Sequence, residues 1–231
     1  MHIDRLGSVP NQLSLRSALA RCKGRGMQIQ TIIDVGASNG AWSLTAKEFF
    51  PDAFCFMIEA QSCWEGALQQ LKASRSDVDY LLAAAADKPG EIFFEANDPL
   101  GGLASHSQPT GRVLRVPCTT VDLQVEQRSL QGPFLLKLDT HGFEKPIFEG
   151  AHKTLWKTDL IVVETYNFKI AQTCLRFHEI IAYLESKGFR CVDMCDPLWR
   201  PLDQALWQFD LFFIPASHPL FKANYYVPPQ P

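Results

Sequence analysis

Seven short runs of apolar residues recur along the chain with helical patterns between them. Each run is nearly continuous instead of alternating with polar residues, which is typical of strands buried on both faces of a parallel sheet. The first, TIIDVG, is rich in β-branched residues and ends in glycine. The runs are Thr31–Gly36, Phe54–Glu59, Val78–Ala86, Phe134–Asp139, Asp159–Thr165, Phe189–Cys195 and Phe209–Pro215.

Amphipathic patterns between these runs predict helices. An apolar stripe with helical spacing marks an N-terminal helix through Leu15, Ala18, Leu19 and Cys22, and a second stripe runs from Phe177 to Leu184. Strands that alternate with helices predict an α/β fold with a doubly wound, mostly parallel sheet and helices on both faces. Further helices are predicted at Trp42–Phe50, Ser62–Ala73 and Glu144–Trp156.

The 231 residues contain no internal repeat and no linker, so we expect one main domain over residues 27–218. A helical extension over residues 1–26 precedes it, and a tail over residues 219–231 follows. The segment Asn97–Gly111 is rich in Gly, Pro, Ser and Asn. It is either a binding loop or lid, or a surface loop without such a role.

The Pro-rich end of the tail, residues 225–231, is predicted to fray. Its aromatic side chains leave two arrangements open. They form an interface, as in a homodimer, or they fold back onto the domain. These side chains are Phe221, Tyr225 and Tyr226.

Net charge and composition exclude several classes of partner and location. The formal net charge is −3 and no basic run occurs, so no nucleic-acid partner is expected. No apolar stretch approaches the ~20 residues that a membrane span requires, and the N-terminus lacks the pattern of a secretory signal. The seven cysteines form no CxxC motif and are expected to be free thiols. These features predict a cytoplasmic protein.

The first predicted strand runs into a glycine-rich turn, Asp34-Val35-Gly36-Ala37-Ser38-Asn39-Gly40. Glycine lets a chain turn sharply and lets a ligand approach the backbone, and ligands of open α/β sheets bind at the carboxyl ends of the strands. The second strand ends in Glu59, whose carboxylate is placed to accept hydrogen bonds from both hydroxyls of a ribose. Together, the glycine-rich turn and the acid at the end of the second strand predict a nucleoside cofactor.

The turn favours S-adenosyl-L-methionine over NAD. A dinucleotide-binding turn has the pattern G-x-G-x-x-G. This chain has Ser38 at the middle glycine of that pattern and Ala41 at the last. Asp34 would repel a pyrophosphate but could accept a hydrogen bond from an α-ammonium group. In the alternative interpretation the glycines only serve the turn, and Asp34 caps a helix.

Beyond this turn the chain resembles the FkbM-type methyltransferases, a family of Rossmann-like methyltransferases that use S-adenosylmethionine. The most selective block is Leu136-Lys137-Leu138-Asp139-Thr140-His141-Gly142-Phe143-Glu144, and the family usually has an acidic or amide residue where this chain has His141. The resemblance implies a seven-stranded sheet and methyl transfer to varied acceptors, often sugar or polyketide hydroxyls. Its other blocks are Ile33–Gly40, Glu59, Ala84–Gly90, Thr119–Asp122, Glu149–Ala151 and Glu164.

We expect His141 to be the general base, with Asp139 positioning it or the acceptor; alternatively, His141 is an ordinary turn residue. Asp87 is expected near the adenine ring, as the comparable acid is in related folds, although its surroundings also suit a simple turn. The expected cofactor-binding residues are Asp34, Gly36, Ala37, Ser38, Asn39, Gly40, Glu59, Asp87 and Asp139. His106 and Arg112 either touch the acceptor or are solvated loop residues.

Lys137 lies in an apolar strand and needs a partner, for which Glu164 and Glu144 are the candidates. Asp139, His141 and Glu144 offer oxygen and imidazole donors within six residues. They span a strand end and a helix start, so we predict no metal site.

The predicted function is O-methylation of a hydroxyl on a small molecule, sugar or glycan. No membrane partner is expected. The alternatives are a nicotinamide-dependent oxidoreductase and a non-catalytic nucleotide-binding scaffold. Amino-group methylation is disfavoured because no N-P-P-Y or D-P-P-Y motif occurs.

Overall fold

A computed structural model describes residues 12–96, 98, 101–108 and 113–227 of the chain. Its main sheet has seven strands in the order β10-β11-β9-β8-β1-β2-β3. The five from β9 to β3 are parallel, and β11 is antiparallel to both of its neighbours. The predicted α/β class with a mostly parallel sheet is therefore confirmed. The strands are β1 (Thr31–Val35), β2 (Phe54–Glu59), β3 (Val78–Leu82), β8 (Phe134–Leu138), β9 (Thr158–Tyr166), β10 (Phe189–Trp199) and β11 (Leu206–Pro215).

The order of the strands creates a crevice at the centre of the sheet. The chain runs from β1 outward through β2 to β3, and later returns to β8 on the other side of β1. The loops after β1 and β8 therefore leave in opposite directions, and ligands of open α/β sheets bind at such a point. The glycine-rich turn follows β1, and Asp139 follows β8.

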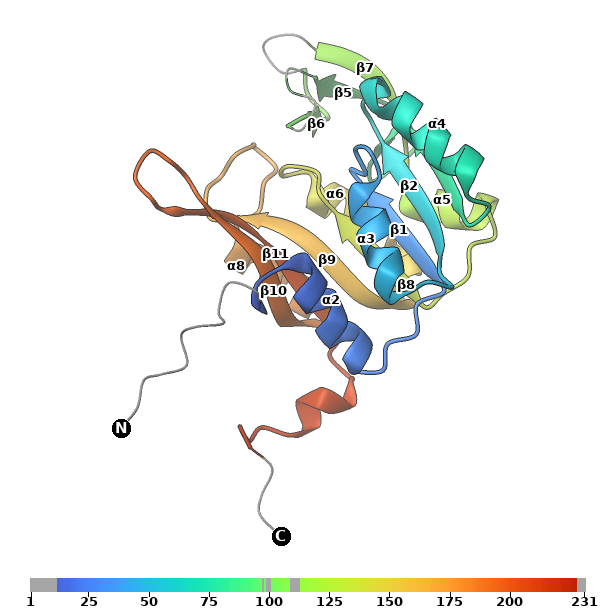
Figure 1. Cartoon of the computed structure of the whole chain (residues 1–231). Helices are drawn as coiled ribbons and strands as arrows, with labels where there is room; N and C mark the ends of the chain where they lie inside the picture. The colour runs from blue at the N-terminus through green and yellow to red at the C-terminus, as the bar shows by residue number, and fades with distance from the viewer. Residues whose placement is uncertain (1–11, 97, 99–100, 109–112, 228–231) are drawn as a thin grey trace.

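Helices cover both faces of the sheet (Figure 1). Two clusters of buried apolar side chains separate the layers, one on each face. The helices of one face are α2 (Leu15–Gly24), α3 (Ala41–Phe49) and α4 (Glu65–Ser74, preceded by the 3-10 turn Ser62–Trp64). Those of the other are α5 (Val121–Gln127), α6 (Glu144–Glu149), α7 (His152–Leu155) and α8 (Phe177–Ser186).

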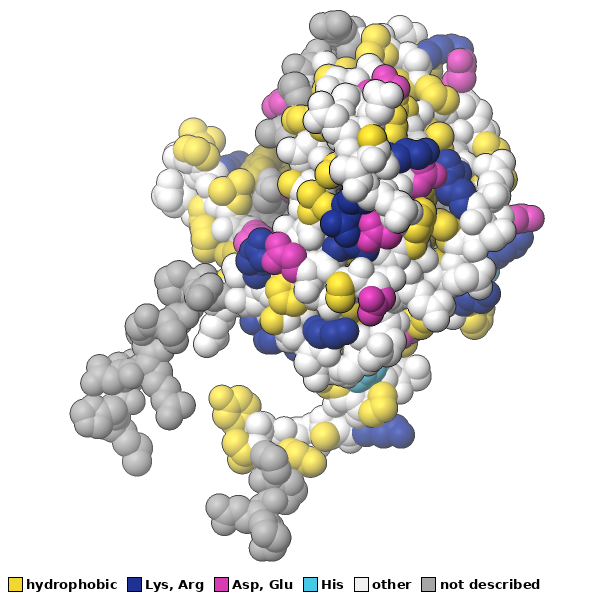
Figure 2. Space-filling view, turned by 45° about the vertical axis from the view of Figure 1, so that its right-hand side comes forward, with side chains coloured by type: hydrophobic (Ala, Val, Ile, Leu, Met, Phe, Trp, Pro, Cys, Tyr) yellow, Lys and Arg dark blue, Asp and Glu magenta, His cyan; other side chains and the backbone are white. Residues whose placement is uncertain are grey.

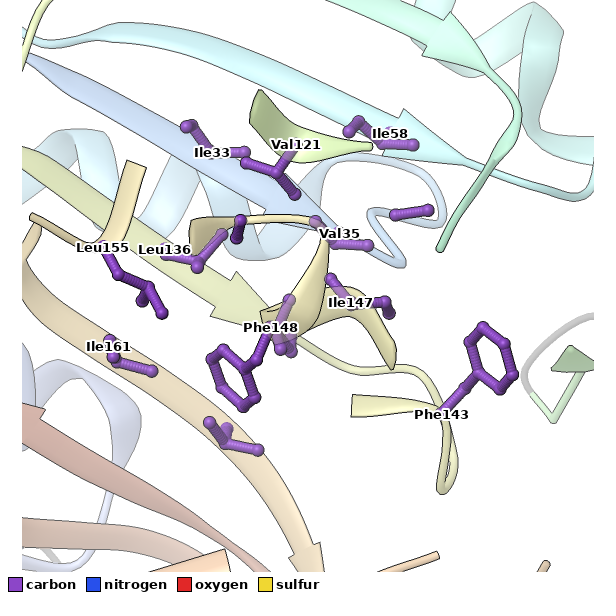
Figure 3. Close-up of a cluster of buried hydrophobic side chains, with 14 of the residues drawn as sticks. Ile33, Val35, Ile58, Val121, Leu136, Phe143, Ile147, Phe148, Leu155 and Ile161 are labelled. Atoms are coloured by element: carbon purple, nitrogen blue, oxygen red, sulfur yellow. The ribbon is translucent and has the colours of Figure 1, made fainter. Parts of the chain in front are cut away.

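The helix predicted over Glu144–Trp156 is two helices, with a break at Gly150-Ala151. A Cβ atom on Gly150 would lie 2.1 Å from the carbonyl oxygen of Ala86, so the backbones approach closely there. Figure 3 shows Ile147 and Phe148 of α6 packed toward β1 and β8, with Phe143 apart at the edge of the cluster. This edge is where the crevice begins.

A second, four-stranded sheet lies beyond the ends of β1 and β2, at the top of Figure 1. Its order is β4-β7-β5-β6, and its strands are β4 (Ala84–Ala85), β5 (Gly90–Glu95), β6 (Leu103–Ser105) and β7 (Val113–Thr119). The run predicted as one strand over Val78–Ala86 is thus divided between the two sheets. The segment predicted as irregular contains β6, and residues 97, 99–100 and 109–112 of this region lie outside the described part.

The N-terminal helix is part of the core. Its Ala18, Leu19 and Cys22 side chains are fully buried, and the Arg21 guanidinium donates two hydrogen bonds of 2.7 Å to Asp193 on β10. None of the helices in the described part of the chain has the length and apolar character of a membrane span. On the face shown in Figure 2, basic and acidic side chains are interspersed.

The C-terminal tail folds back in part. Phe221 packs against the core, and the Arg190 guanidinium lies over its ring at 4.1 Å. Tyr225 and Tyr226 are exposed. Residues 228–231 of the predicted frayed end lie outside the described part.

Asp122 holds the start of α7, and its replacement by alanine is expected to lower the free energy of unfolding by about 1–2 kcal/mol. Its carboxylate accepts hydrogen bonds of 2.8 Å from the backbone N–H groups of Lys153 and Thr154 and one of 2.7 Å from the Thr154 hydroxyl. Urea denaturation measures the change. The control is Glu126→Ala, because Glu126 lies on α5 as Asp122 does but is exposed. It should change the free energy of unfolding by less than about 0.5 kcal/mol. Equal stabilities of the two variants would contradict the capping role.

Candidate active site

The glycine-rich turn brings the ends of β1 and β8 into contact. A Cβ atom on Gly36, whose φ is +76°, would lie 2.0 Å from the carbonyl oxygen of Asp139. Gly40 has a φ of +80° and stands immediately before α3, whose start is capped by the Asn39 side chain accepting from the N–H of Ala41. Both glycines are therefore required by the backbone, and Asn39 serves the helix.

Glu59 closes the turn from the end of β2. Its two carboxylate oxygens accept hydrogen bonds of 2.7 Å from the backbone N–H groups of Ser38 and Gln61. The residue is 6% exposed, and burial raises its pKa against the opposing effect of these two bonds. Each carboxylate oxygen keeps a second lone pair for a further donor.

A cavity of about 630 Å³, open to solvent, lies above this turn. The main sheet, the small sheet and the loop after β8 all contribute to its walls. Its lining is mostly apolar, with the Glu59 carboxylate as a buried acceptor. We call it the first cavity, and it is lined by Val35, Gly36, Ser38, Ile58, Glu59, Ala60, Gln61, Ala83, Ala84, Ala85, Phe94, Gly102, Ala104, Asp139, Thr140, His141, Phe143 and Ile147.

Asp34 faces the protein interior. It is fully buried, its Oδ1 lies 3.0 Å from the Lys137 ammonium, and its Oδ2 accepts a hydrogen bond of 2.7 Å from the Ser43 hydroxyl. Burial raises the pKa of Asp34, and the Lys137 ammonium opposes that effect. The structure thus gives Asp34 an internal partner where the sequence predicted a ligand.

Lys137 does not pair with Glu164 or Glu144, so that prediction was wrong. Its ammonium lies 3.0 Å from Asp34 and 3.3 Å from Asp139, and donates a hydrogen bond of 2.9 Å to the Gly36 carbonyl. Burial works against the charged form, but the two carboxylates outweigh it and raise the pKa of Lys137. One ammonium thereby ties the glycine turn to the loop after β8.

Glu144 shapes that loop from within. Its carboxylate accepts hydrogen bonds from the N–H of Gly142 at 2.8 Å and from the Thr140 hydroxyl at 3.2 Å. Burial raises its pKa. Glu144 is therefore buried and turned inward, and it does not converge with Asp139 and His141.

The group that joins Asp139 and His141 is instead Glu164, from β9. The His141 Nε2 atom lies 3.7 Å from Asp139 Oδ1 and 3.7 Å from Glu164 Oε2. The Tyr166 hydroxyl and the Gln208 amide both donate to Glu164. The three side chains converge at the crevice.

The two carboxylates of this group differ in charge. Burial and the neighbouring Asp139 raise the pKa of Glu164 to about 9. Burial acts in the same direction on Asp139, but Lys137 and His141 outweigh it and hold the pKa of Asp139 below its usual value. Asp139 is thus the ionised member of the pair at neutral pH.

A second cavity of about 1030 Å³, open to solvent, adjoins the first. Asp139 and His141 line both cavities and form the wall between them. Its aromatic residues, Tyr166 and Trp207, come from β9 and β11. The residues lining it are Asp98, Gly101, Leu103, Asp139, His141, Glu164, Tyr166, Ile170, Trp207 and Gln208.

Of the residues predicted to bind the cofactor, the first cavity is lined by Gly36, Ser38, Glu59 and Asp139, but not by Asp34, Ala37, Asn39, Gly40 or Asp87. Asp87 Oδ1 lies 3.0 Å from His106 Nε2, and the His106 ring packs at 5.2 Å from that of Phe143. This pair therefore ties the small sheet to the edge of the core. Arg112 lies outside the described residues.

The wall that the small sheet supplies contains Gly102 and Ala104, which belong to the segment that the sequence predicts to be either a binding loop or a surface loop without such a role. The sequence reasoning missed Phe94 of the first cavity and Trp207 and Gln208 of the second. It also missed Gln61, although the position of Gln61 two residues after the acid that ends β2 is a signal that could have found it.

The strand order and the glycine turn define a Rossmann-like α/β protein with an open cavity at its switch point. The chain belongs to the FkbM methyltransferase family, because residues 34–191 match the Methyltransferase FkbM domain. This match covers more than half of the chain and confirms the resemblance noted in the sequence. No curated protein matches the chain.

Solved structures similar to this chain have low sequence identity to it. The methyltransferase FkbM from Methylobacillus flagellatus KT superposes with a TM-score of 0.50 and 13% identity over 79% of this chain, which spans 43% of that chain. Precorrin-6y C5,15-methyltransferase from Geobacter metallireducens GS-15 superposes with a TM-score of 0.46 and 12% identity over 86% of each chain. Magnesium protoporphyrin IX methyltransferase from Synechocystis PCC 6803 was solved with bound SAM. It superposes with a TM-score of 0.47 and 10% identity over 90% of this chain and 80% of that chain.

Proposed function

We propose that this chain is a methyltransferase that uses S-adenosyl-L-methionine and methylates a hydroxyl group of a small molecule, sugar or glycan. The observation that carries the proposal is the wall shared by the two cavities. Asp139 and His141 line both, so a donor in the first cavity and an acceptor in the second would meet at these side chains.

The residues of the first cavity fit an adenosyl group. Its lining is mostly apolar with a few polar groups, as in small-molecule sites. The Glu59 carboxylate is fixed by two backbone N–H groups and retains a lone pair on each oxygen for the two hydroxyls of a ribose. Phe94 and Ile58 supply apolar surface for a flat base. Asp34, which is bound to Lys137, supports the turn from behind.

The bound donor would supply a methyl group on a positively charged sulfur. The protein's task is to align the acceptor oxygen with that carbon and to exclude water. As the oxygen–carbon bond forms and the carbon–sulfur bond breaks, the electron pair of the broken bond stays on sulfur and the hydroxyl must lose its proton. We assign activation of the hydroxyl to His141, whose Nε2 atom lies 3.7 Å from the Asp139 carboxylate, and direct acceptance of the proton by the imidazole is the simplest form of that role.

Membership of a methyltransferase family favours this function over the nicotinamide-dependent alternative. Ser38 also stands where a dinucleotide turn requires glycine, and its φ is +50°. The non-catalytic scaffold differs from the proposal in turnover only, so it is separated by assay.

Isothermal titration with S-adenosylhomocysteine tests the proposal. We expect micromolar binding to the wild-type protein and none of NAD in a parallel titration. Screening hydroxylated acceptors with labelled donor then identifies the product. Binding of NAD in place of S-adenosylhomocysteine would overturn the proposal in favour of the oxidoreductase. Absence of binding by either would overturn the proposal, because the first cavity would then hold neither cofactor.

A further inference from the structure

We propose that Asp139, His141 and Glu164 bind a divalent cation of the Mg²⁺ or Mn²⁺ type in the wall of the second cavity. This inference rests on the proposed function only for what the cation does, since the cation site itself can be tested without a methyl donor or an acceptor. The three residues come from the loop after β8 and from β9.

The spacing of the ligand atoms suits an ion. One ligand atom from each residue lies within 4.8 Å of the other two, and the His141 nitrogen is 3.7 Å from each carboxylate oxygen. A separation of 3.7 Å is too long for a hydrogen bond. Two ligands at right angles around an ion about 2.1 Å away are about 3 Å apart, so a small rotation of the imidazole closes the site.

Two further observations point to a cation. Among the residues that the structure describes, His141 donates and accepts no hydrogen bond, although it stands between two acids. Asp139 and Glu164 bring two carboxyl groups to the same imidazole, and the Lys137 ammonium, 3.3 Å from Asp139, is shared with the buried Asp34 3.0 Å away. A divalent ion between the two carboxyl groups would bind both in their ionised form and supply the positive charge that the shared ammonium does not.

The surroundings hold Glu164 in place. The Tyr166 hydroxyl donates to Oε2, and the Gln208 amide donates to Oε1. Hydrogen bonds of this kind orient ligands and contribute to metal affinity. Each oxygen retains a lone pair that a cation could accept. The sequence predicted no metal on a cluster that contained Glu144, whose carboxylate is turned inward, and the structure puts Glu164 in its place.

Two carboxylates and one imidazole match the donor preferences of Mn²⁺ and, through their oxygens, of Mg²⁺. Three protein ligands leave coordination positions directed at the second cavity. A cation held there would make an acceptor hydroxyl bound to it more acidic, so that its proton would pass to solvent before the oxygen takes the methyl group. His141 in this arrangement activates the acceptor as a ligand of the cation.

Mn²⁺ alone is the probe. Protein freed of metal with a chelator is titrated with Mn²⁺, and the electron paramagnetic resonance signal of the free ion reports binding. The wild-type protein is expected to bind one Mn²⁺, and Glu164→Gln and His141→Ala to weaken binding by at least about tenfold. Glu48→Gln, which removes an exposed acid, should leave it unchanged.

The titration with S-adenosylhomocysteine separates the two proposals. Glu164 does not line the first cavity, so Glu164→Gln should still bind S-adenosylhomocysteine, which also shows that the variant is folded. A folded wild-type protein that binds no Mn²⁺, or binding that is equal in Glu164→Gln and His141→Ala, would overturn the cation site and leave the proposed function intact. If the wild-type protein binds Mn²⁺ but not S-adenosylhomocysteine, the cation site stands and the proposed function is overturned.

Discussion

Replacing Lys137 by methionine is expected to lower the free energy of unfolding by about 3–5 kcal/mol. The reason is Asp34, which is fully buried and loses the ammonium 3.0 Å from its Oδ1. Methionine keeps the length of the side chain, so the loss reports the charge and not a cavity. The hydrogen bond to the Gly36 carbonyl is lost as well.

Urea denaturation at neutral pH measures this effect, and a second substitution identifies its cause. The double variant Lys137→Met with Asp34→Asn removes both charges, and asparagine can still accept the hydrogen bond from Ser43. It should recover about 1–3 kcal/mol relative to the single variant, because neighbouring sites are coupled. A double variant no more stable than Lys137→Met would show that the ion pair with Asp34 is not the source of the loss.

Glu59→Gln is expected to weaken binding of S-adenosylhomocysteine about a hundredfold, which corresponds to about 3 kcal/mol. A charged carboxylate accepts from two hydroxyls at once, whereas an amide has one acceptor oxygen and its NH₂ group would face a backbone N–H. In the protein those N–H groups belong to Ser38 and Gln61, 2.7 Å from the carboxylate.

Isothermal titration of the purified variants gives the comparison. Glu48→Gln, an exposed change on α3, is the matched control and should bind as the wild type does. Circular dichroism checks that Glu59→Gln is folded, because Glu59 also holds the turn. Undiminished affinity in folded Glu59→Gln would remove Glu59 from the cofactor site.

The main sheet could be predicted from the sequence because its strands are buried on both faces. The runs at Phe54–Glu59 and Phe134–Asp139 match β2 and β8 within one residue. The small sheet could not. In β7 most side chains alternate in exposure, and Pro117 interrupts the apolar pattern. A short strand with one exposed face carries too weak a pattern to distinguish it from a loop.

The site was predictable as far as it is local. His141 and Asp139 are neighbours along the chain, and their meeting at a strand end follows from the apolar run before them. The partner of Lys137 depends on which strands are adjacent. Lys137 and Asp34 are direct partners in the parallel register of β8 and β1, 103 residues apart in the numbering, and the sequence alone does not give that register. Glu164 joins the pair for the same reason, through β9.

The helix α2 is held by a strand that comes much later in the chain. Its buried face, with Ala18 and Leu19, packs on the layer that also contains Cys195 of β10, and Arg21 is bound to Asp193. On the ribosome, this helix emerges long before β10 has been translated. The part of its apolar face that packs on α3 can be covered early, whereas the part that packs on β10 and the Arg21 ion pair can form only after the last third of the chain has been made.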